Sequence, residues 1–188
     1  ARQHHSFIGR KASPIKTLDE QPGQLPELKL DHLFRMSDST GIFQHASFTV
    51  PNLAEGYCTD DTARALVLAM MLQKLGLGSP QLEAQAATYA AFLNHAFDRV
   101  RGRFRNFMSF ERHWLEEVGS EDCQGHALWA LGLCVAQAGQ GSFQMLAAQL
   151  FEQPLPATVE FASPRAWAFT LIGMDEYLQR LSGDRLVN

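Results

Sequence analysis

The sequence predicts an all-α protein, and three observations lead to this prediction. Long stretches of the chain carry apolar residues at helical spacing, several of them begin at serine, threonine or aspartate, and most end at glycines. The composition is that of an ordinary globular protein, with 46% hydrophobic and 19% charged residues among 188. A chain of this length supplies enough apolar surface for one sizeable core.

The N-terminal part of the chain is expected to differ from the rest. Residues 1–26 are polar, hold three of the eight prolines and lack periodicity, which predicts a linker or a surface arm. A helical domain is expected over residues 27–188, starting with a short helix over 27–36. A long irregular stretch over 37–59 follows, and loops of this length in compact domains are usually functional.

The remainder of the domain is expected to be helical, with one interruption. The helices are expected over residues 60–75, 79–100, 122–138, 142–151 and 164–181. The second begins with Ser79 as N-cap and Pro80 at the first helical position, a favourable pair. Residues 101–114 are predicted to form an extended hairpin around Gly102, because their apolar residues alternate irregularly.

The expected helices are of two kinds. Some are apolar on every face, which predicts burial on every face; they include residues 65–72 (ALVLAMML), 127–136 (ALWALGLCVA) and 166–174 (AWAFTLIGM). Others, such as residues 81–99, are amphipathic. This alternation along the chain is typical of a two-layer α/α toroid, in which inner helices are wrapped by outer ones.

A weak internal repeat supports the toroid. The segments 127–132 and 168–173 align, because both run from apolar residues to a glycine. The spacing between inner helices is irregular, which fits a repeat of helical hairpins with loop insertions.

A polar cluster stands at the start of each expected inner helix. The clusters are residues 59–64 (TDDTAR), 120–126 (SEDCQGH) and 163–165 (SPR). Helix capping explains part of this pattern, since the helix dipole favours acids in a first turn. Capping needs only one or two such residues, however, and adjacent acids occur twice. If these helices are inner ones, their starts open at the same end of the toroid and their carboxylates face one cavity.

The candidate catalytic residues are the carboxylates of the two acidic pairs: Asp60, Asp61, Glu121 and Asp122. Glycoside cleavage needs two carboxyl groups, one acting as acid and the other as base or nucleophile. Sugar binding without cleavage also uses carboxylates as acceptors for hydroxyls, together with aromatic rings as stacking platforms. Both interpretations remain open, as does simple capping.

Two arginines and one histidine of the inner-helix starts are candidate substrate-binding residues. Arg64 and Arg165 lie at or near the start of otherwise uncharged helices, and a buried arginine must be paired. Arg64 is therefore expected either to bridge to an acid of the neighbouring helix start or to contact a ligand. His126 is expected to be either a hydrogen-bonded structural residue or a general base.

The loops supply the other candidate substrate-binding residues. Asp38 and His45 lie in the long irregular stretch and could reach the same mouth. Tyr57 and Trp114 are candidates for stacking on a sugar ring.

No metal ion or cofactor is predicted. A zinc site built from Cys58, Asp60, Cys123 and His126 is not supported, because Cys58 has no local partner. The Asp60-Asp61 pair also occurs in the aspartate-rich motif of isoprenoid enzymes, but that motif needs an Asp where Arg64 stands. The sequence has no P-loop, no GxGxxG and no nucleophile elbow.

Charge and cysteine usage point to a cytoplasmic protein that binds neither nucleic acid nor a membrane. The net charge of −4 and the absence of a basic face argue against a nucleic-acid partner. There is no signal peptide and no apolar run of ~18 residues, so no membrane span is expected. Three widely spaced cysteines do not make a disulfide framework, which fits a reducing compartment.

Several strings of the sequence resemble bacterial six-hairpin glycosidase-like domains that occur fused to, or beside, glycosyltransferases. These strings are residues 31–33 (DHL), 40–46 (TGIFQHA), 56–66 (GYCTDDTARAL) and 120–132 (SEDCQGHALWALG). The resemblance covers about residues 27–185, and the part around 58–66 is the most specific.

This resemblance implies an (α/α) toroid, an oligosaccharide or sugar ligand, and a glycosyltransferase as a candidate partner. By motif position it implies functional roles for Asp60, Asp61, Arg64, Glu121, Asp122 and Arg165. The family often has Asn where Thr62 stands and Arg where His126 stands, and these departures leave open any role for the two positions.

The chain is expected to supply about half of a toroid. Twelve helices with their loops need ~300–350 residues, roughly twice the present length. It could be a fragment, a truncated product, or a half completed by a second copy. An open half would expose apolar inner-helix surface, which predicts self-association.

Three functional hypotheses follow. The first is an enzyme-like domain that acts on glycans with acids from two helix starts. The second is a non-catalytic module that recognises sugar or supports a glycosyltransferase. The third, a toroid of the isoprenoid or lanthionine type, would need a bound metal ion.

Overall fold

The computed structural model describes residues 26–139 and 141–187. The chain divides into a unit of residues 1–30 and a compact unit of residues 31–188, and every site described below lies in the second. The linker predicted over residues 1–26 lies outside the described residues except for Pro26.

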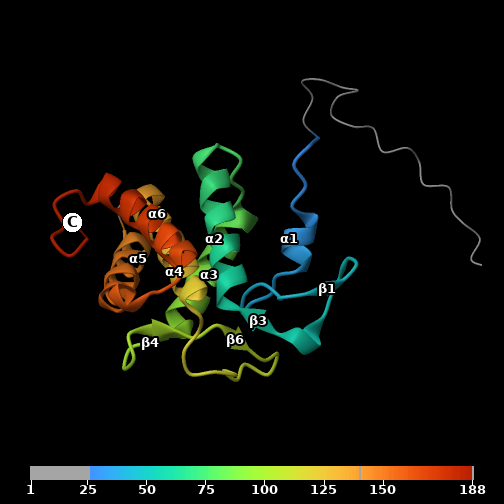
Figure 1. Ribbon diagram of the computed structural model, residues 1–188. Helices are drawn as coiled ribbons and strands as arrows, with labels where there is room; N and C mark the ends of the chain where they lie inside the picture. The colour runs from blue at the N-terminus through green and yellow to red at the C-terminus, as the bar shows by residue number, and fades with distance from the viewer. Residues whose placement is uncertain (1–25, 140, 188) are drawn as a thin grey trace, which may run out of the picture. The chain divides into compact units, whose positions relative to one another are not determined.

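The second unit is mostly helical, as predicted (Figure 1). Its helices are α1 (Asp31–Arg35), α2 (Thr59–Lys74), α3 (Pro80–Ala96), α4 (Glu121–Gln137), α5 (Ser142–Glu152) and α6 (Pro164–Arg180). Short 3-10 turns span Leu53–Glu55 and Leu155–Glu160. The bounds predicted for α2, α4, α5 and α6 agree with the structure to within one residue at each end, and α1 is shorter than the expected helix over 27–36.

The described residues also form six two-residue strands, three between α1 and α2 and three between α3 and α4. They are β1 (Ala46–Ser47), β2 (Val50–Pro51), β3 (Tyr57–Cys58), β4 (Phe97–Asp98), β5 (Arg103–Phe104) and β6 (Phe107–Met108). All three pairs are antiparallel: β1 with β2, β3 with β6, and β4 with β5.

The hairpin predicted over residues 101–114 exists only in part. Helix α3 ends at Ala96 rather than near residue 100, and the chain turns directly into β4. The Asp98 carboxylate closes this turn by accepting the N–H groups of Val100 and Arg101 at 2.9 and 3.2 Å. Gly102 follows with a φ of +65°, a conformation that favours glycine. The hairpin is thus β4 with β5, whereas β6 pairs with the distant β3.

Local serine caps explain where three of the helices begin. A serine hydroxyl accepts a main-chain N–H of the first turn of α3, α4 and α6, in the pairs Ser79–Leu82, Ser120–Cys123 and Ser163–Ala166. Helix α2 differs, because Cys58 at its N-cap makes no capping hydrogen bond with its side chain. The side-chain oxygen of Asn106 replaces it and accepts the N–H of Asp60 at 3.1 Å.

Helix α4 packs against α2 on one side and α6 on the other, and α3 and α5 pack on α2 and α4 (Figure 1). Helices α4 and α6 run parallel and approach closely through two glycines. A Cβ on Gly132 would lie 2.1 Å from the carbonyl oxygen of Gly173, and one on Gly173 would lie 2.6 Å from that of Leu128. These are the glycines that end the two aligned segments of the predicted repeat.

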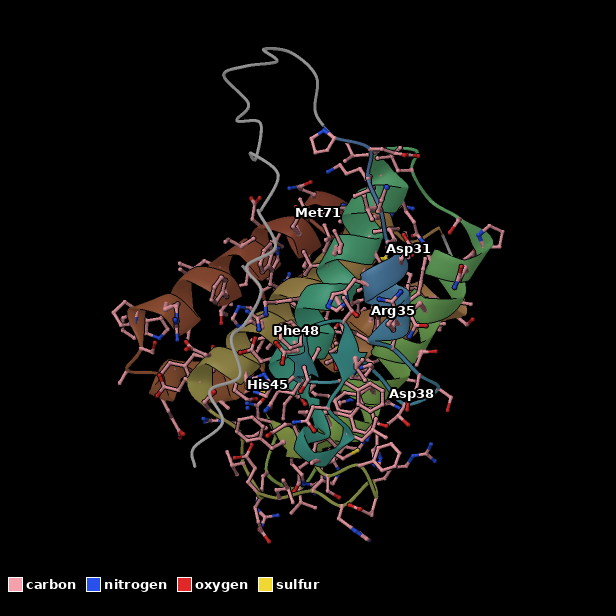
Figure 2. The ribbon with its side chains drawn as sticks, turned by 90° about the vertical axis from the view of Figure 1, so that its right-hand side faces the viewer. Asp31, Arg35, Asp38, His45, Phe48 and Met71 are labelled. Atoms are coloured by element: carbon pink, nitrogen blue, oxygen red, sulfur yellow. The ribbon has the colours of Figure 1, made fainter. Side chains whose placement is uncertain are left out.

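The prediction that α2, α4 and α6 are buried on every face is confirmed for α4 and is wrong for α2 and α6. Nearly every residue between Cys123 and Val135 is buried. In contrast, α2 exposes Leu68 and Met71, and α6 exposes Trp167, Leu171 and Ile172. Figure 2 labels Met71 on α2. These two helices are therefore apolar on every face but buried on only part of their surface, because no described segment covers the remaining side of each.

Candidate functional site

Two side-chain contacts bring the starts of α2, α4 and α6 together. The Nδ1 atom of His126 on α4 lies 3.0 Å from Oδ1 of Asp60 on α2. Arg165 on α6 forms an ion pair with Asp122 on α4. The three helix starts therefore share one group of charged residues, called here the charged cluster: Asp60, Asp61, Arg64, Asp122, His126 and Arg165.

His126 is the buried centre of the charged cluster. Its Nδ1 lies 2.9 Å from the main-chain oxygen of Asp122, in hydrogen-bond geometry, and the 3.0 Å contact with Asp60 is chiefly electrostatic. Because both neighbours are acceptors, Nδ1 carries a proton. The ring also packs against Phe169, with 4.0 Å between ring centroids and an interplanar angle of 34°. The imidazole is thus held in one orientation, which supports the structural interpretation of this histidine.

Asp60 stays ionised at neutral pH. Burial by itself would raise the pKa of its carboxyl group, but the contact with His126 and the charges of His126, Arg64 and Arg165 outweigh burial. Their combined effect holds the pKa of Asp60 below its usual range. Asp60 is therefore an ionised carboxylate and lacks the raised pKa of a general acid.

Arg64 pairs within its own helix. Its Nε lies 3.3 Å from Oδ1 of Asp60, and its guanidinium also pairs with Asp61. The predicted bridge from Arg64 to the neighbouring helix start is therefore wrong, because the acids one turn earlier in α2 are closer partners. Arg165 makes that kind of bridge instead, and the side chains of Arg64 and Arg165 are 54% and 71% exposed.

Glu121 is a structural residue in this fold. Its carboxylate accepts the main-chain N–H of Ala162 at 2.9 Å and that of Ser163 at 2.7 Å. These contacts fix the segment that leads into α6. The predicted catalytic role of Glu121 is not supported, because catalysis would compete with two hydrogen bonds that position a helix.

Asp122 has one carboxylate oxygen without a hydrogen-bond partner. Its Oδ2 pairs with Arg165, whereas its Oδ1 is buried and has no partner in the described part of the chain. A buried acceptor without a partner costs about 1–3 kcal/mol. Asp122 thus combines an unused acceptor with an exposed guanidinium. Oδ1 of Asp60 also lacks a hydrogen-bond partner in the described residues, but it lies 3.0 Å from Nδ1 of His126 and 3.3 Å from Nε of Arg64.

Comparisons with known proteins add nothing to this picture. No family profile matches the chain, and neither does any curated protein or solved structure.

Asp38 and Tyr57 hold the long loop together rather than joining the charged cluster. Asp38 accepts the N–H groups of Thr40 and Gly41 with one oxygen and the hydroxyl of Tyr57, at 2.7 Å, with the other. Tyr57 is 1% exposed and its ring stacks on Phe43. Stacking of Tyr57 on a ligand is therefore an incorrect prediction, because its ring is covered.

For the other two loop candidates the structure shows no contact with the charged cluster within residues 26–139 and 141–187. His45 is exposed just before β1, and Figure 2 shows it well separated from Asp38. Trp114 contacts Phe92 and His95 of α3, and the Arg105 guanidinium lies 5.7 Å from its ring centroid. Its ring contacts are thus with α3 and the segment after β5.

Asn106 is an important residue that no sequence pattern singles out. Its side-chain oxygen accepts the N–H of Asp60 and the thiol of Cys58, and its main-chain oxygen accepts the N–H of Thr59 at 2.8 Å. Glu116 in turn accepts the N–H of Asn106 at 2.7 Å. These partners are far apart in sequence, so no local pattern could reveal them. Together they position the acids at the start of α2.

The chemistry available at the site is that of carboxylates, guanidinium groups and one imidazole. Cys58, Cys123 and Cys134 are buried free thiols, and burial raises the pKa of Cys58 to about 12. Within residues 26–139 and 141–187, no three His, Cys, Asp or Glu side chains are grouped so as to hold a metal ion. In the same ranges no helix combines the length and apolarity needed to cross a membrane.

Proposed function

We propose that this chain is a carbohydrate-binding domain, built as about half of an α/α toroid, whose ligand lies at the charged cluster. Support for the toroid comes from the three parallel helices α2, α4 and α6, whose starts meet at one end. Support for carbohydrate comes from the resemblance of residues 56–66 and 120–132 to glycosidase-like domains.

The observation that carries the proposal is the unused acceptor of Asp122 beside exposed guanidinium groups. Sugar hydroxyls both donate and accept hydrogen bonds, so they need carboxylate acceptors and cationic donors at the same place. Asp122 Oδ1 supplies an acceptor without a partner in the described residues, and Arg165 pairs with the same carboxylate. Arg64 supplies a second exposed guanidinium in the charged cluster. A small rearrangement of the Asp122 and Arg165 side chains would let one sugar hydroxyl donate a hydrogen bond to Asp122 and accept one from Arg165.

Binding without cleavage fits these residues better than hydrolysis does. All four predicted catalytic carboxylates are engaged: Asp60 and Asp61 by Arg64, Glu121 by main-chain N–H groups, and Asp122 by Arg165. A glycosidase needs one carboxyl group with a raised pKa, whereas the pKa of Asp60 is lowered. The enzyme-like function is therefore the alternative that measured turnover would establish.

The test is a glycan array probed with the full chain, followed by a turnover assay on every glycan that binds. Asp122→Asn is expected to weaken binding at least about tenfold, because it removes the charge that Arg165 and a ligand share. Glu83→Gln is the matched control, since it removes an exposed carboxylate from α3.

Two results would overturn the proposal. One is an array on which no glycan binds the wild-type chain. The other is cleavage of a bound glycan that Asp122→Asn abolishes while binding stays within an order of magnitude, which would establish the enzyme-like alternative.

A further inference from the structure

A pocket of about 520 Å³ lies between the end of α3, the β4–β5 hairpin and the segment that follows β6. This volume is within the range of about 300–1,000 Å³ that small-molecule sites usually occupy. Most of the lining is charged or aromatic: His95, Arg101, Arg105, Trp114, Glu116 and Glu117. None of these residues belongs to the charged cluster, so the pocket is a separate candidate site.

The buried carboxylate of Asp98 holds two guanidinium groups of the pocket next to each other. Its Oδ2 accepts a hydrogen bond from Nη1 of Arg101 and another from Nη2 of Arg105, both at 2.9 Å. The Asp98 side chain is only 5% exposed, whereas those of Arg101 and Arg105 are 44% and 25% exposed. The two guanidinium groups are therefore fixed in position and still accessible, which lowers the entropy that a ligand loses on binding them.

The carboxylates at this pocket differ in how firmly they are held. Asp98 and Glu116 each accept two main-chain N–H groups. Glu117 pairs with Arg101, has no main-chain donor among the described residues, and has a side chain that is 74% exposed. An exposed ion pair of this kind contributes little to stability. Glu117 is therefore the carboxylate that a ligand can displace from Arg101.

The pairing of Arg101 with Glu117 indicates which chemical group the pocket takes. Glu117 is itself a carboxylate, and planar carboxylates match the geometry of a guanidinium group. A ligand carboxylate that replaces the one of Glu117 leaves the charge balance at the two arginines unchanged. The pocket thus favours a carboxylate over an uncharged ligand.

The other lining groups indicate what the rest of the ligand carries. The second oxygen of Glu116 and the imidazole of His95 make no hydrogen bond within the described part of the chain. A carboxylate oxygen accepts from hydroxyl groups, and a neutral imidazole both donates and accepts. Trp114 and Leu115 add apolar surface for a short carbon skeleton. These groups fit a carboxylate whose carbon skeleton bears hydroxyl groups.

We propose that this pocket binds a sugar acid, a small carboxylate with several hydroxyl groups. Its carboxylate lies on Arg101 and Arg105, and its hydroxyl groups contact Glu116 and His95. Glu117 occupies the arginine in the free protein and leaves it when the ligand binds. The inference goes beyond the proposed function, because it assigns a second site with residues of its own.

The test is calorimetric titration of the full chain with gluconate and glucuronate at low ionic strength. Glucitol and methyl glucoside keep the hydroxyl groups without the carboxylate, and acetate keeps the carboxylate alone. At least one sugar acid is expected to bind ten or more times tighter than its neutral counterpart and than acetate. Inorganic phosphate is expected to bind more weakly than that sugar acid, because it cannot use the hydroxyl-binding groups.

Two exposed acids provide a matched pair of variants. Glu117 pairs with Arg101 in the pocket, whereas Glu160 pairs with Arg103, at 3.7 Å, and does not line it. Their side chains are 74% and 76% exposed, and each change to glutamine removes one negative charge. Glu117→Gln is expected to tighten sugar-acid binding about threefold, because the competing carboxylate is gone. Glu160→Gln is expected to leave the affinity unchanged.

Arg101→Gln tests the cationic side of the pocket. It is expected to weaken sugar-acid binding at least about tenfold. Asp98 keeps Arg105 and two main-chain donors in this variant, and thermal unfolding checks that it folds. If it does not fold, the Glu117→Gln result decides the question by itself.

Three results would overturn the inference: neutral sugars that bind as tightly as the sugar acids, phosphate that binds more tightly than both acids, or an affinity that Glu117→Gln fails to raise. None of these measurements involves Asp122 or Arg165. The proposed site at the charged cluster is therefore tested separately, and either proposal can fail while the other stands.

Discussion

The imidazole of His126 on α4 lies 3.0 Å from the carboxylate of Asp60 on α2, with its ring held between Asp60 and Phe169. This contact ties together two helix starts that are distant in sequence. Burial raises the pKa of the Asp60 carboxyl group, and this contact, together with the charges of His126, Arg64 and Arg165, outweighs burial and keeps Asp60 ionised.

The first prediction concerns acid stability. The pKa of Asp60 is lower in the folded state than in the unfolded chain, so its contribution is fully present above the unfolded pKa of about 4 and is lost as the pH falls through the folded pKa. Asp60→Asn is expected to cost about 2 kcal/mol at pH 7. The difference should shrink as the pH falls below about 4, as measured by urea unfolding at a series of pH values. A difference that stays constant down to pH 2 would show that the charge of Asp60 does not stabilise the fold.

The second prediction concerns alkaline stability and the Asp38–Tyr57 hydrogen bond of 2.7 Å. Burial, followed by the hydrogen bond to Asp38, raises the pKa of Tyr57 to about 12. Its contribution is therefore complete below pH 10 and is lost between about pH 10 and 12. Tyr57→Phe is expected to remove about 1 kcal/mol at pH 7 and to flatten the alkaline loss. If wild type and variant lose the same unfolding free energy between about pH 10 and 12, the alkaline loss does not come from Tyr57.

The third prediction concerns the close approach of α4 and α6. An alanine at Gly173 would place its Cβ 2.6 Å from the main-chain oxygen of Leu128, so the helices would have to separate. Gly173→Ala is expected to cost about 2–4 kcal/mol of unfolding free energy. Gly183→Ala is the control, since nothing lies within 4 Å of its Cβ position. Similar unfolding midpoints for both variants would contradict the close approach of α4 and α6 at Gly173.

The fourth prediction concerns the apolar side chains that α2 and α6 leave exposed. Leu68, Met71, Trp167 and Leu171 form uncovered surface on the two helices that flank α4. Surfaces of this kind favour association, and the chain is expected to sediment as a dimer. Trp167→Glu should shift it to a monomer, whereas the exposed Val100→Glu in the β4–β5 turn should not. A stable wild-type monomer at high concentration would count against self-association and against an open half-toroid.

The sequence predicted the helices well because their start signals are local. Ser79, Ser120 and Ser163 cap helices within their own first turns, and a pattern of that range can be read from the chain. The start of α2 is different, since Asn106 caps it from a segment far along the chain.

The candidate site was predictable only in part, because some of its features depend on local sequence and others on contacts between distant segments. The acids and arginines at the helix starts could be selected from their positions, and the structure brings Asp60, Asp122, His126 and Arg165 together. The burial of Tyr57 and the position of Trp114 depend on packing between distant segments, which no periodicity reports.

The most direct measurement of the central claim is a calorimetric titration of wild type, Asp122→Asn, Arg165→Ala and Glu83→Gln with the glycan that binds best on the array. Saturable binding by wild type and Glu83→Gln is expected, with at least about tenfold weaker binding by the two charged-cluster variants. Equal affinities for all four proteins would contradict the claim, because they would place the sugar away from the charged cluster.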